Sequence, residues 1–378
     1  MENENKIKTV LDFYTKVNSL KNVIIDQKNN QSLANYLFGT MIIATAMDSE
    51  FKETNDLAKV YRMLLLSEIN YIDPKYNFED LKKSDQFQKE LEEAGDFESK
   101  NAKLLFKYKI INNLLSSLIN DKNEELSFEE MIKEGTDIIS KACKNNSNCC
   151  EEIFKYYYYN YNLNNKVRSA WDDKHWKIKT DRIERVSEHV IDTLGLAIGL
   201  YSEFDYDYDF NKVLKTLVIH ETGEAKVPDF TPFDGKTQEE KIEIEHNALK
   251  EVIGGLKNRQ SLIGMLYDFD EAKLPESEFA YLCDKMVLNL QAKIYQEEGM
   301  QRPLDDQKDN IVFQSPKIQE FIKNGATEPF DIFYEWDRSK FENNSRFPEF
   351  EEMFKWIKQN QIIDTNYKKS NKQYSLKI

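Results

Sequence analysis

Side chains that can bind metal ions, histidines or carboxylates, lie at three places in the second half of the chain, each beside an apolar helical stretch. His189 precedes one apolar run, His220 and Glu221 end a second, and Asp284 lies within a third. Neutral imidazoles and carboxylates from facing helices are ligands for divalent metal ions. Two nitrogens and two carboxylates would leave coordination positions open for water and substrate, which is typical of a catalytic site. We therefore predict that His189, His220, Glu221 and Asp284 bind one metal ion.

Each of these residues taken alone also has a purely structural explanation. A single histidine on an apolar helix is commonly a satisfied core residue, and Asp284 could be the buried partner of a lysine. For the whole cluster, the alternative is a buried network of histidines and acids that only ties a helical bundle together. The joint order and spacing of the four residues favour the metal site over this alternative.

This combination resembles the HD-domain superfamily and, within it, the 5′-deoxynucleotidase-like branch. The resemblance covers roughly residues 170 to 296. The segments that carry it are, in chain order, Glu184 to His189, His220-Glu221 with Glu224, Asp229 before Thr231-Pro232, and Asp284-Lys285 before Leu290-Gln291-Ala292. The resemblance implies an HD-type helical bundle, a single divalent metal ion (Mn, Co, Ni, Fe, Zn or Mg) and hydrolysis of a nucleoside monophosphate or a related phosphate ester.

Two further acids gain roles from the same resemblance. Glu224 is similar to the family's acid that hydrogen-bonds the attacking water or protonates the leaving oxygen, and Asp229 to the second acid of the pocket. These roles are chemically reasonable, because a metal ion lowers the pKa of its water and a nearby carboxyl group can protonate the departing sugar alkoxide. We therefore predict Glu224 and Asp229 as catalytic residues.

The branch also carries an Arg-Trp pair shortly before its first metal-binding histidine, and His175-Trp176 occupies nearly that place here. Trp176 would then pack against the sugar of the substrate, although a plain core position is the alternative. The predicted substrate-binding group consists of Lys174, His175, Trp176 and Lys177, of which the basic members would contact the phosphate.

Glu221 departs from the family, which has Asp at this position. The added methylene moves the carboxylate by about 1.5 Å, which could reposition the ion, make its coordination bidentate or weaken its binding. The leading prediction is a metal-dependent phosphohydrolase acting on (deoxy)nucleoside 5′-monophosphates or triphosphates. The alternative is a catalytically weakened HD protein that serves as a nucleotide-binding or scaffolding module. A second metal is not expected, because only four histidines exist and His246 falls on a charged helix where it should be exposed.

Helices must position these residues, and the composition predicts an all-α fold. Twelve Gly and eight Pro among 378 residues suit packed helices better than a turn-rich β protein. Apolar residues recur with helical periodicity in most of the chain. The predicted helices are 33–47, 56–69, 101–118, Phe128–Cys143, 186–201, 211–224, 238–256, 277–296 and 348–360.

The first half repeats the pattern of the second half without its ligands. The interval between Tyr36 and Ser67 equals that between His189 and His220. The positions of the four ligands become Tyr36, Ser67, Glu68 and Phe106, a set that cannot hold a divalent ion in the same way. An unrelated helical domain with chance similarity is the alternative.

We predict three parts of the chain on this basis. Residues 1–145 form a degenerate HD-like domain that arose by tandem duplication and packs as an internal pseudo-dimer partner. Residues 165–300 form the HD phosphohydrolase domain, and residues 301–378 a helical C-terminal extension.

The remaining expectations concern partners and compartment. A net charge of −15 opposes wide contact with a nucleic-acid polymer, whereas a small nucleotide remains possible beside a bound cation. No run of about 18 apolar residues occurs, so no membrane association is expected and the protein should be soluble and cytoplasmic. The four cysteines have no zinc-site spacing and are expected to be reduced thiols.

Overall fold

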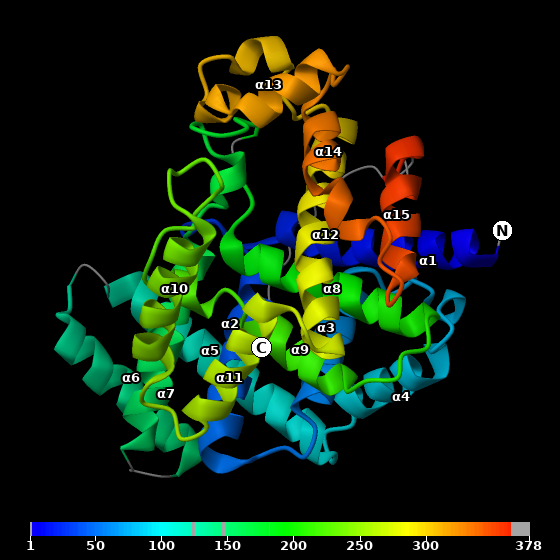
Figure 1. Ribbon diagram of the computed structural model, residues 1–378. Helices are drawn as coiled ribbons and strands as arrows, with labels where there is room; N and C mark the ends of the chain where they lie inside the picture. The colour runs from blue at the N-terminus through cyan, green and yellow to red at the C-terminus, as the bar shows by residue number, and fades with distance from the viewer. Residues whose placement is uncertain (1, 123–124, 145–147, 181, 364–378) are drawn as a thin grey trace.

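The computed structural model describes residues 2–122, 125–144, 148–180 and 182–363, and this part of the chain folds almost entirely into helices (Figure 1). The predicted all-α class is confirmed. The α-helices are α1 (Glu2–Asn18), α2 (Leu33–Phe51), α3 (Leu57–Ile72), α4 (Ser84–Gly95), α5 (Lys100–Lys122), α6 (Phe128–Cys143), α7 (Cys149–Tyr161), α8 (Val186–Glu203), α9 (Phe210–Ile219), α10 (Gln238–Ile253), α11 (Arg259–Glu271), α12 (Pro275–Glu297), α13 (Pro316–Lys323), α14 (Pro329–Phe341) and α15 (Pro348–Gln359).

Short elements connect these helices. An antiparallel pair of strands, β1 (Ile24–Asp26) and β2 (Gln31–Ser32), precedes α2. The 3₁₀ helices are η1 (Ser19–Asn22), η2 (Phe78–Asp80), η3 (Asn162–Asn164), η4 (Ser169–Trp171), η5 (Thr222–Ala225), η6 (Leu304–Gln307) and η7 (Ile311–Gln314).

Most of the predicted helices are present within a few residues of the expected bounds, and α6 has the predicted bounds. The exception is the helix predicted over 211–224, because α9 ends at Ile219 and η5 follows after a break. A β-carbon on Gly223 would lie 3.0 Å from the carbonyl oxygen of Glu245. The glycine therefore lets α10 approach η5 closely, and the tight turn replaces the last turn of the expected helix.

The second half is built around α8, α9 and α12, which pack against one another in pairs. Figure 1 shows α12 crossing in front of α8, with α9 beside both. The side chains along α8 and α12 that face this junction are almost completely buried, including His189 and Asp284. These three helices are therefore the frame on which the predicted ligands are mounted.

The first half has a corresponding trio, α2, α3 and α5, whose members also pack in pairs. The two trios meet where α2 contacts α8 and α3 contacts α9. The helix that precedes each trio crosses to the other half, since α1 lies on α8 and α7 lies on α2. Each half is therefore covered in part by a helix from the other half.

One residue of the predicted silent site is wrong. Phe106 is 48% exposed on α5, so it does not correspond to the buried Asp284. Lys109 is the tenth residue of α5, as Asp284 is of α12, and its Nζ lies 2.5 Å from Glu68 Oε1. The ammonium group of Lys109 therefore pairs with the Glu68 carboxylate between α5 and α3. The shift arose because apolar helices align equally well in several registers.

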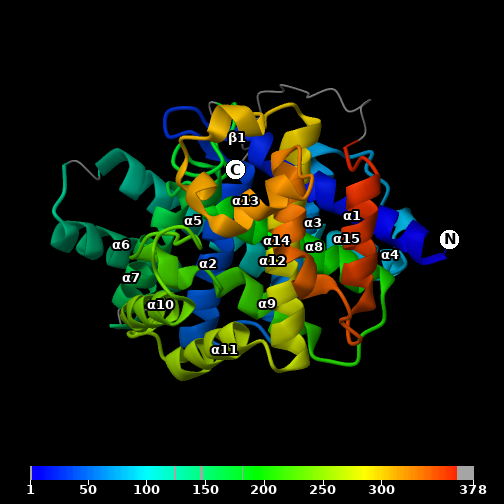
Figure 2. The same cartoon turned by 45° about the horizontal axis from the view of Figure 1, so that its top comes forward.

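The C-terminal helices complete the second half rather than forming a separate layer. Figure 2 shows α13 and α14 lying over α12, and both α14 and α15 contact α12. Within α14, Phe333 packs against Trp171 and Trp176. Residues 364–378 of the predicted extension lie outside the described residues.

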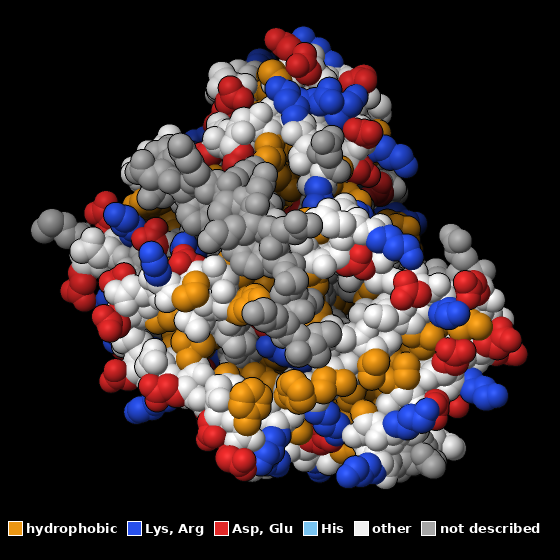
Figure 3. All heavy atoms as spheres, turned by 180° about the vertical axis from the view of Figure 1, so that it is seen from behind, with side chains coloured by type: hydrophobic (Ala, Val, Ile, Leu, Met, Phe, Trp, Pro, Cys, Tyr) orange, Lys and Arg blue, Asp and Glu red, His pale blue; other side chains and the backbone are white. Residues whose placement is uncertain are grey.

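Acidic and basic side chains are interspersed on the face seen in Figure 3, with hydrophobic side chains gathered in its lower part. None of the described helices is long and apolar enough to cross a membrane. Cys143 and Cys283 are free thiols, as predicted for the cysteines.

Close packing between α1 and α8 depends on a small residue. A β-carbon on Gly195 would lie 2.6 Å from Val17 Cγ1, so Gly195→Ala should force the helices apart and lower the free energy of unfolding by about 1–3 kcal/mol. The control is Gly264→Ala within α11, where a β-carbon meets nothing within 4 Å and alanine should add about 0.5–1 kcal/mol. Urea unfolding measures both, and equal changes would contradict the packing argument.

Candidate metal centre

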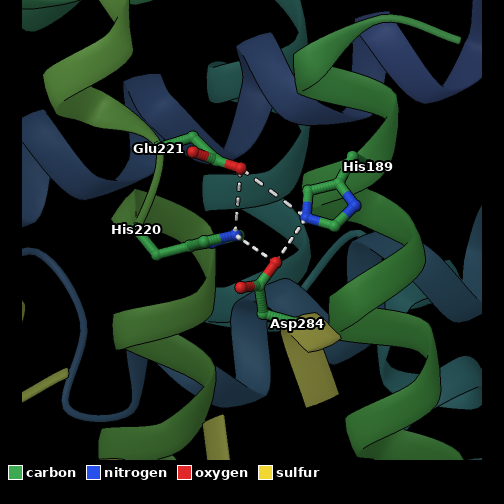
Figure 4. Close-up of side chains that lie close together, drawn as sticks. All are labelled: His189, His220, Glu221 and Asp284. Carbon is green, nitrogen blue, oxygen red and sulfur yellow. Dashed lines mark hydrogen bonds and ion pairs between the residues drawn. The ribbon is translucent and has the colours of Figure 1, made fainter. Parts of the chain in front are cut away.

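The four predicted ligands converge in the structure. One ligand atom from each of His189, His220, Glu221 and Asp284 lies within 4.8 Å of the others. Figure 4 shows the side chains pointing toward one another from the first turn of α8, from the end of α9 and from the middle of α12. Residues 95 positions apart therefore meet at one buried point.

The distances within the cluster suit a shared metal ion. His189 Nε2 is 2.8 Å from Asp284 Oδ1 and 3.6 Å from Glu221 Oε1. His220 Nε2 is 3.6 Å from the same Glu221 oxygen and 3.9 Å from Asp284 Oδ1. Ligand atoms about 2.1 Å from one ion lie roughly 3.0 Å apart at octahedral angles and roughly 3.4 Å apart at tetrahedral angles. The observed spacings lie around these values.

His220 has an unpartnered nitrogen facing the cluster. Its Nδ1 donates to the carbonyl oxygen of Leu217 at 2.7 Å, which assigns the lone pair to Nε2. That buried Nε2 has no hydrogen-bond partner among the described residues. A buried nitrogen lone pair without a donor is costly, and a metal ion would satisfy it. The donor set therefore fits a divalent ion.

The protonation states also suit metal binding. Burial by itself would raise the pKa of Glu221, but Arg168 and the two imidazoles lower it to about 2. Burial likewise opposes ionisation of Asp284, yet Lys285 and the His189 hydrogen bond hold its pKa well below the usual range. Burial lowers the pKa of His220. The carboxylates are thus ionised and His220 is neutral near pH 7, as metal ligation requires.

Arg168 joins the cluster to the neighbouring acids. Its Nη1 donates to Glu221 Oε1 at 2.8 Å and lies 3.6 Å from Asp229 Oδ2. The Ser169 backbone N–H also donates to Asp229 Oδ2, at 2.9 Å. The Glu221 carboxylate therefore faces both the other cluster residues and the Arg168 guanidinium. Its side chain is one methylene longer than the Asp of the resembled family, and Arg168 is the specific partner of this longer side chain.

Glu224 lies at the edge of the same centre on η5. Burial raises its pKa well above the usual range, and Asp229 and Glu221 raise it further. Its Oε2 is buried and has no hydrogen-bond partner in the described part of the chain. A carboxyl group whose pKa is raised in this way is a suitable general acid. The predicted acids Glu224 and Asp229 are thus both brought to the centre.

Three lysines surround these acids. Lys285 Nζ is 2.7 Å from Asp284 Oδ2, and Lys241 Nζ donates to the carbonyl oxygen of Phe230 at 2.9 Å. Lys166 donates to the backbone carbonyl oxygens of Glu224 and Val227, which fixes the turn after η5. Together with Arg168, they give an otherwise acidic protein a local set of cations where an anion could bind.

The predicted substrate-binding group makes its contacts outside the four-residue cluster. His175 Nδ1 is 2.7 Å from Asp172 Oδ1 and Nε2 is 3.0 Å from Thr231 Oγ1, while Trp176 is buried against Phe333. Lys174 is exposed and Lys177 has a positive φ of 42°. Within the described residues, no side chain from 174–177 hydrogen-bonds or ion-pairs with the four-residue cluster.

Sequence reasoning missed Arg168. The Arg-Trp pair of the resembled branch is a basic residue followed directly by tryptophan, and His175-Trp176 fits that pattern. The signal for Arg168 was an arginine followed three residues later by Trp171. These two residues share η4 and its cap, and the Arg168 side chain reaches the cluster.

His246 is less exposed than predicted. Its Nε2 lies 2.6 Å from Asp270 Oδ2, and its ring stacks on Tyr267. A cavity of about 30 Å³ adjoins the cluster on this side and is lined by both His246 and His220. That volume is enough for about one water molecule. Because α10 packs on α11, His246 is partly covered despite its charged sequence neighbours.

Comparisons with known proteins agree with this geometry. Residues 162–324 match the model of the HD domain family. A relative from Dictyostelium discoideum, the 5′-deoxynucleotidase HDDC2, is 30% identical over 125 residues. That match covers 31% of this chain and 66% of the relative. The matched family segment contains all four cluster residues as well as Arg168, Glu224 and Asp229.

The raised pKa of Glu224 predicts a pH-dependent cost to the metal-free fold. The folded protein holds this proton more tightly than the unfolded chain, so Glu224 favours folding most below the ordinary value of 4.5 and loses that contribution as pH rises. Glu224→Gln should therefore gain unfolding free energy relative to wild type as pH rises above the ordinary value of 4.5. Urea unfolding across this pH range tests it. Glu243→Gln, at an exposed position of α10, is the control, and an equal gain there would refute the assignment.

Proposed function

Because residues 162–324 belong to the HD domain family, we propose that this chain is a metal-dependent phosphohydrolase that acts on small nucleotides. The observation that carries the proposal is the set of two imidazole nitrogens and two carboxylate oxygens within 4.8 Å, beside the buried Glu224. A network that only tied helices together would have no need of an unpartnered His220 Nε2 or an unpartnered Glu224 Oε2.

The residues around the cluster have separate tasks in phosphate ester hydrolysis. A bound divalent ion would lower the pKa of a water molecule and polarise the phosphoryl group. Water adds to phosphorus while the bond between phosphorus and the bridging ester oxygen breaks. Glu224 gives its proton to that leaving oxygen, so the products are inorganic phosphate and a neutral alcohol. Asp229 holds Arg168 and the start of η4 in place.

The local cations support a small anionic substrate. Arg168 presents a planar guanidinium beside the cluster, and such groups bind phosphate through paired hydrogen bonds. The nearby Lys241 and Lys285 add positive charge on other sides. We favour (deoxy)nucleoside 5′-monophosphates, with triphosphates as the second class, in line with the activity named for the Dictyostelium relative. Residues 174–177 remain proposed as the outer wall of the substrate site.

We also propose the three-part organisation of 1–145, 165–300 and 301–378, with the first part as a degenerate HD-like unit and internal pseudo-dimer partner. The exchange of α1 and α7 between the halves supports it. So do contacts between the starts of α2 and α8, where Ser32 Oγ donates to Glu188 Oε1 at 2.5 Å and Asn35 Nδ2 to Ser187 Oγ at 2.8 Å.

The first functional prediction is phosphate release. Metal-stripped protein loaded in turn with Mn, Co, Ni, Fe, Zn and Mg should release phosphate from at least one (deoxy)nucleotide. Glu224→Gln should lower kcat by about 10²- to 10⁴-fold with metal affinity unchanged, because the general acid is lost while the ligands remain. Asp268→Asn on α11, which loses a partner of Lys212 away from the cluster, should retain full activity.

Two results would contradict this proposal in different ways. Full turnover by Glu224→Gln would show that another group protonates the leaving oxygen. Absence of phosphate release with every metal and nucleotide, in protein that binds metal, would instead favour a nucleotide-binding or scaffolding role.

The second prediction concerns Glu221. Glu221→Asp withdraws the carboxylate by about 1.5 Å. We expect loss of the 2.8 Å contact with Arg168 and a roughly tenfold weaker metal affinity, because the cluster is spaced for the longer side chain. Calorimetric titration of metal into the stripped protein measures this change. Unchanged affinity would mean that the two acids are interchangeable in this chain.

A further inference from the structure

A second buried charge cluster lies behind the candidate metal centre, and its cation comes from outside the HD domain segment. Lys21 follows α1 in η1 and is 6% exposed. Its Nζ lies 3.0 Å from Glu184 Oε1 and 3.1 Å from Asp192 Oδ2, and it also donates to Gln291 Oε1. A lysine from the first half is therefore enclosed by three polar side chains of the second half.

The partners of Lys21 lie on the same elements as the metal ligands. Asp192 is three residues after His189 on α8, and Gln291 is seven residues after Asp284 on α12. Residues three or seven positions apart share one face of a helix. The ammonium therefore bridges α8 and α12 along the seam where His189 Nε2 and Asp284 Oδ1 meet at 2.8 Å.

Glu184 connects the same lysine to Arg168. Its Oε2 accepts a hydrogen bond from Trp171 Nε1 at 2.9 Å, and its carbonyl oxygen accepts from the Arg168 backbone N–H at 2.9 Å. Both contacts fix η4 and its cap to the start of α8, which carries His189 in its first turn. Lys21 thus fixes the position of Glu184. Glu184 in turn joins the Arg168 segment to the start of the helix that carries His189.

The buried charged groups of this cluster stabilise one another. Burial alone would lower the pKa of Lys21, but Asp192 and Glu184 raise it well above the ordinary value. Asn18 adds a neutral donor, since its Nδ2 lies 2.8 Å from Asp192 Oδ2 and 2.9 Å from Gln291 Oε1. Removing the ammonium would leave Glu184, Asp192 and Gln291 without the buried donor that they share, and they would separate or draw in water.

We propose that Lys21 is a positioning residue through which the first half of the chain sets the spacing of α8, α12 and η4 at the metal centre. It touches neither metal nor substrate and acts through Asp192, Gln291 and Glu184. The inference rests on the proposed function, since it presupposes that the cluster binds an ion.

The test compares two variants of the same α1 and η1 segment in the full chain. Lys21→Met removes the ammonium, whereas Val17→Ala removes packing against Gly195 and leaves the polar cluster intact. Both should lower Tm. Only Lys21→Met should weaken Co²⁺ binding in calorimetric titration, by about tenfold or more, and shift the visible Co²⁺ absorption that reports ligand geometry. Val17→Ala should match wild type in both.

Equal Co²⁺ affinities and spectra for Lys21→Met and Val17→Ala would overturn the proposal, because Lys21 would then serve stability alone. If Lys21→Met does not fold, Asp192→Asn is the variant that tests the proposal. It keeps the ion pair of Lys21 with Glu184 and weakens only the contact of Lys21 with α8. We expect weaker Co²⁺ binding than in Val17→Ala, and equality would again overturn the proposal. Wild type that binds Co²⁺ but releases no phosphate with any of the six metals would refute the proposed function while leaving this comparison valid.

Discussion

The cost of burying four ionisable side chains at one point governs much of this fold. Glu221 and Asp284 are removed from water within the bundle, and carboxylates there are unfavourable unless cations face them. Arg168 and Lys285 supply part of that compensation. Two imidazole nitrogens complete a set that matches a divalent ion better than any internal pairing. The helices around the site are therefore arranged to hold an electrostatic centre as well as to bury apolar surface.

The charge arrangement also separates the roles of the acids. Glu221 and Asp284 have cations or imidazoles beside them, and their pKa values fall. Glu224 is equally buried but lies beside Asp229 and Glu221, so its pKa rises. Neighbouring carboxyl groups that differ in this way suit the metal-ligand and proton-donor roles that we propose for them. Acids that lie close together at the end of α9 and on η5 thus differ in protonation because their neighbours differ.

Both halves contain three helices that pack in pairs, but the charged side chains between these helices differ. In the second half, histidines and acids face one another between α8, α9 and α12, whereas in the first half Lys109 pairs with Glu68 between α5 and α3. A lysine ammonium satisfies its carboxylate without any metal. The crossing of α1 onto α8 then gives that half a direct contact with the elements of the metal centre.

The sequence by itself determined the all-α class, most helix positions and the four ligands, because helical periodicity is local and His189, His220, Glu221 and Asp284 stand out by type and order. Glu224 and Asp229 were predicted from the resemblance to the HD-domain superfamily. The early end of α9 was not predictable, since it depends on α10 approaching Gly223. Phe106 was chosen over Lys109 because apolar helices match in several registers. The contacts of Arg168 with Glu221 and of Lys21 with Glu184 and Asp192 were decided only by tertiary structure, because their partners lie 53, 163 and 171 residues away and no local pattern encodes such pairings.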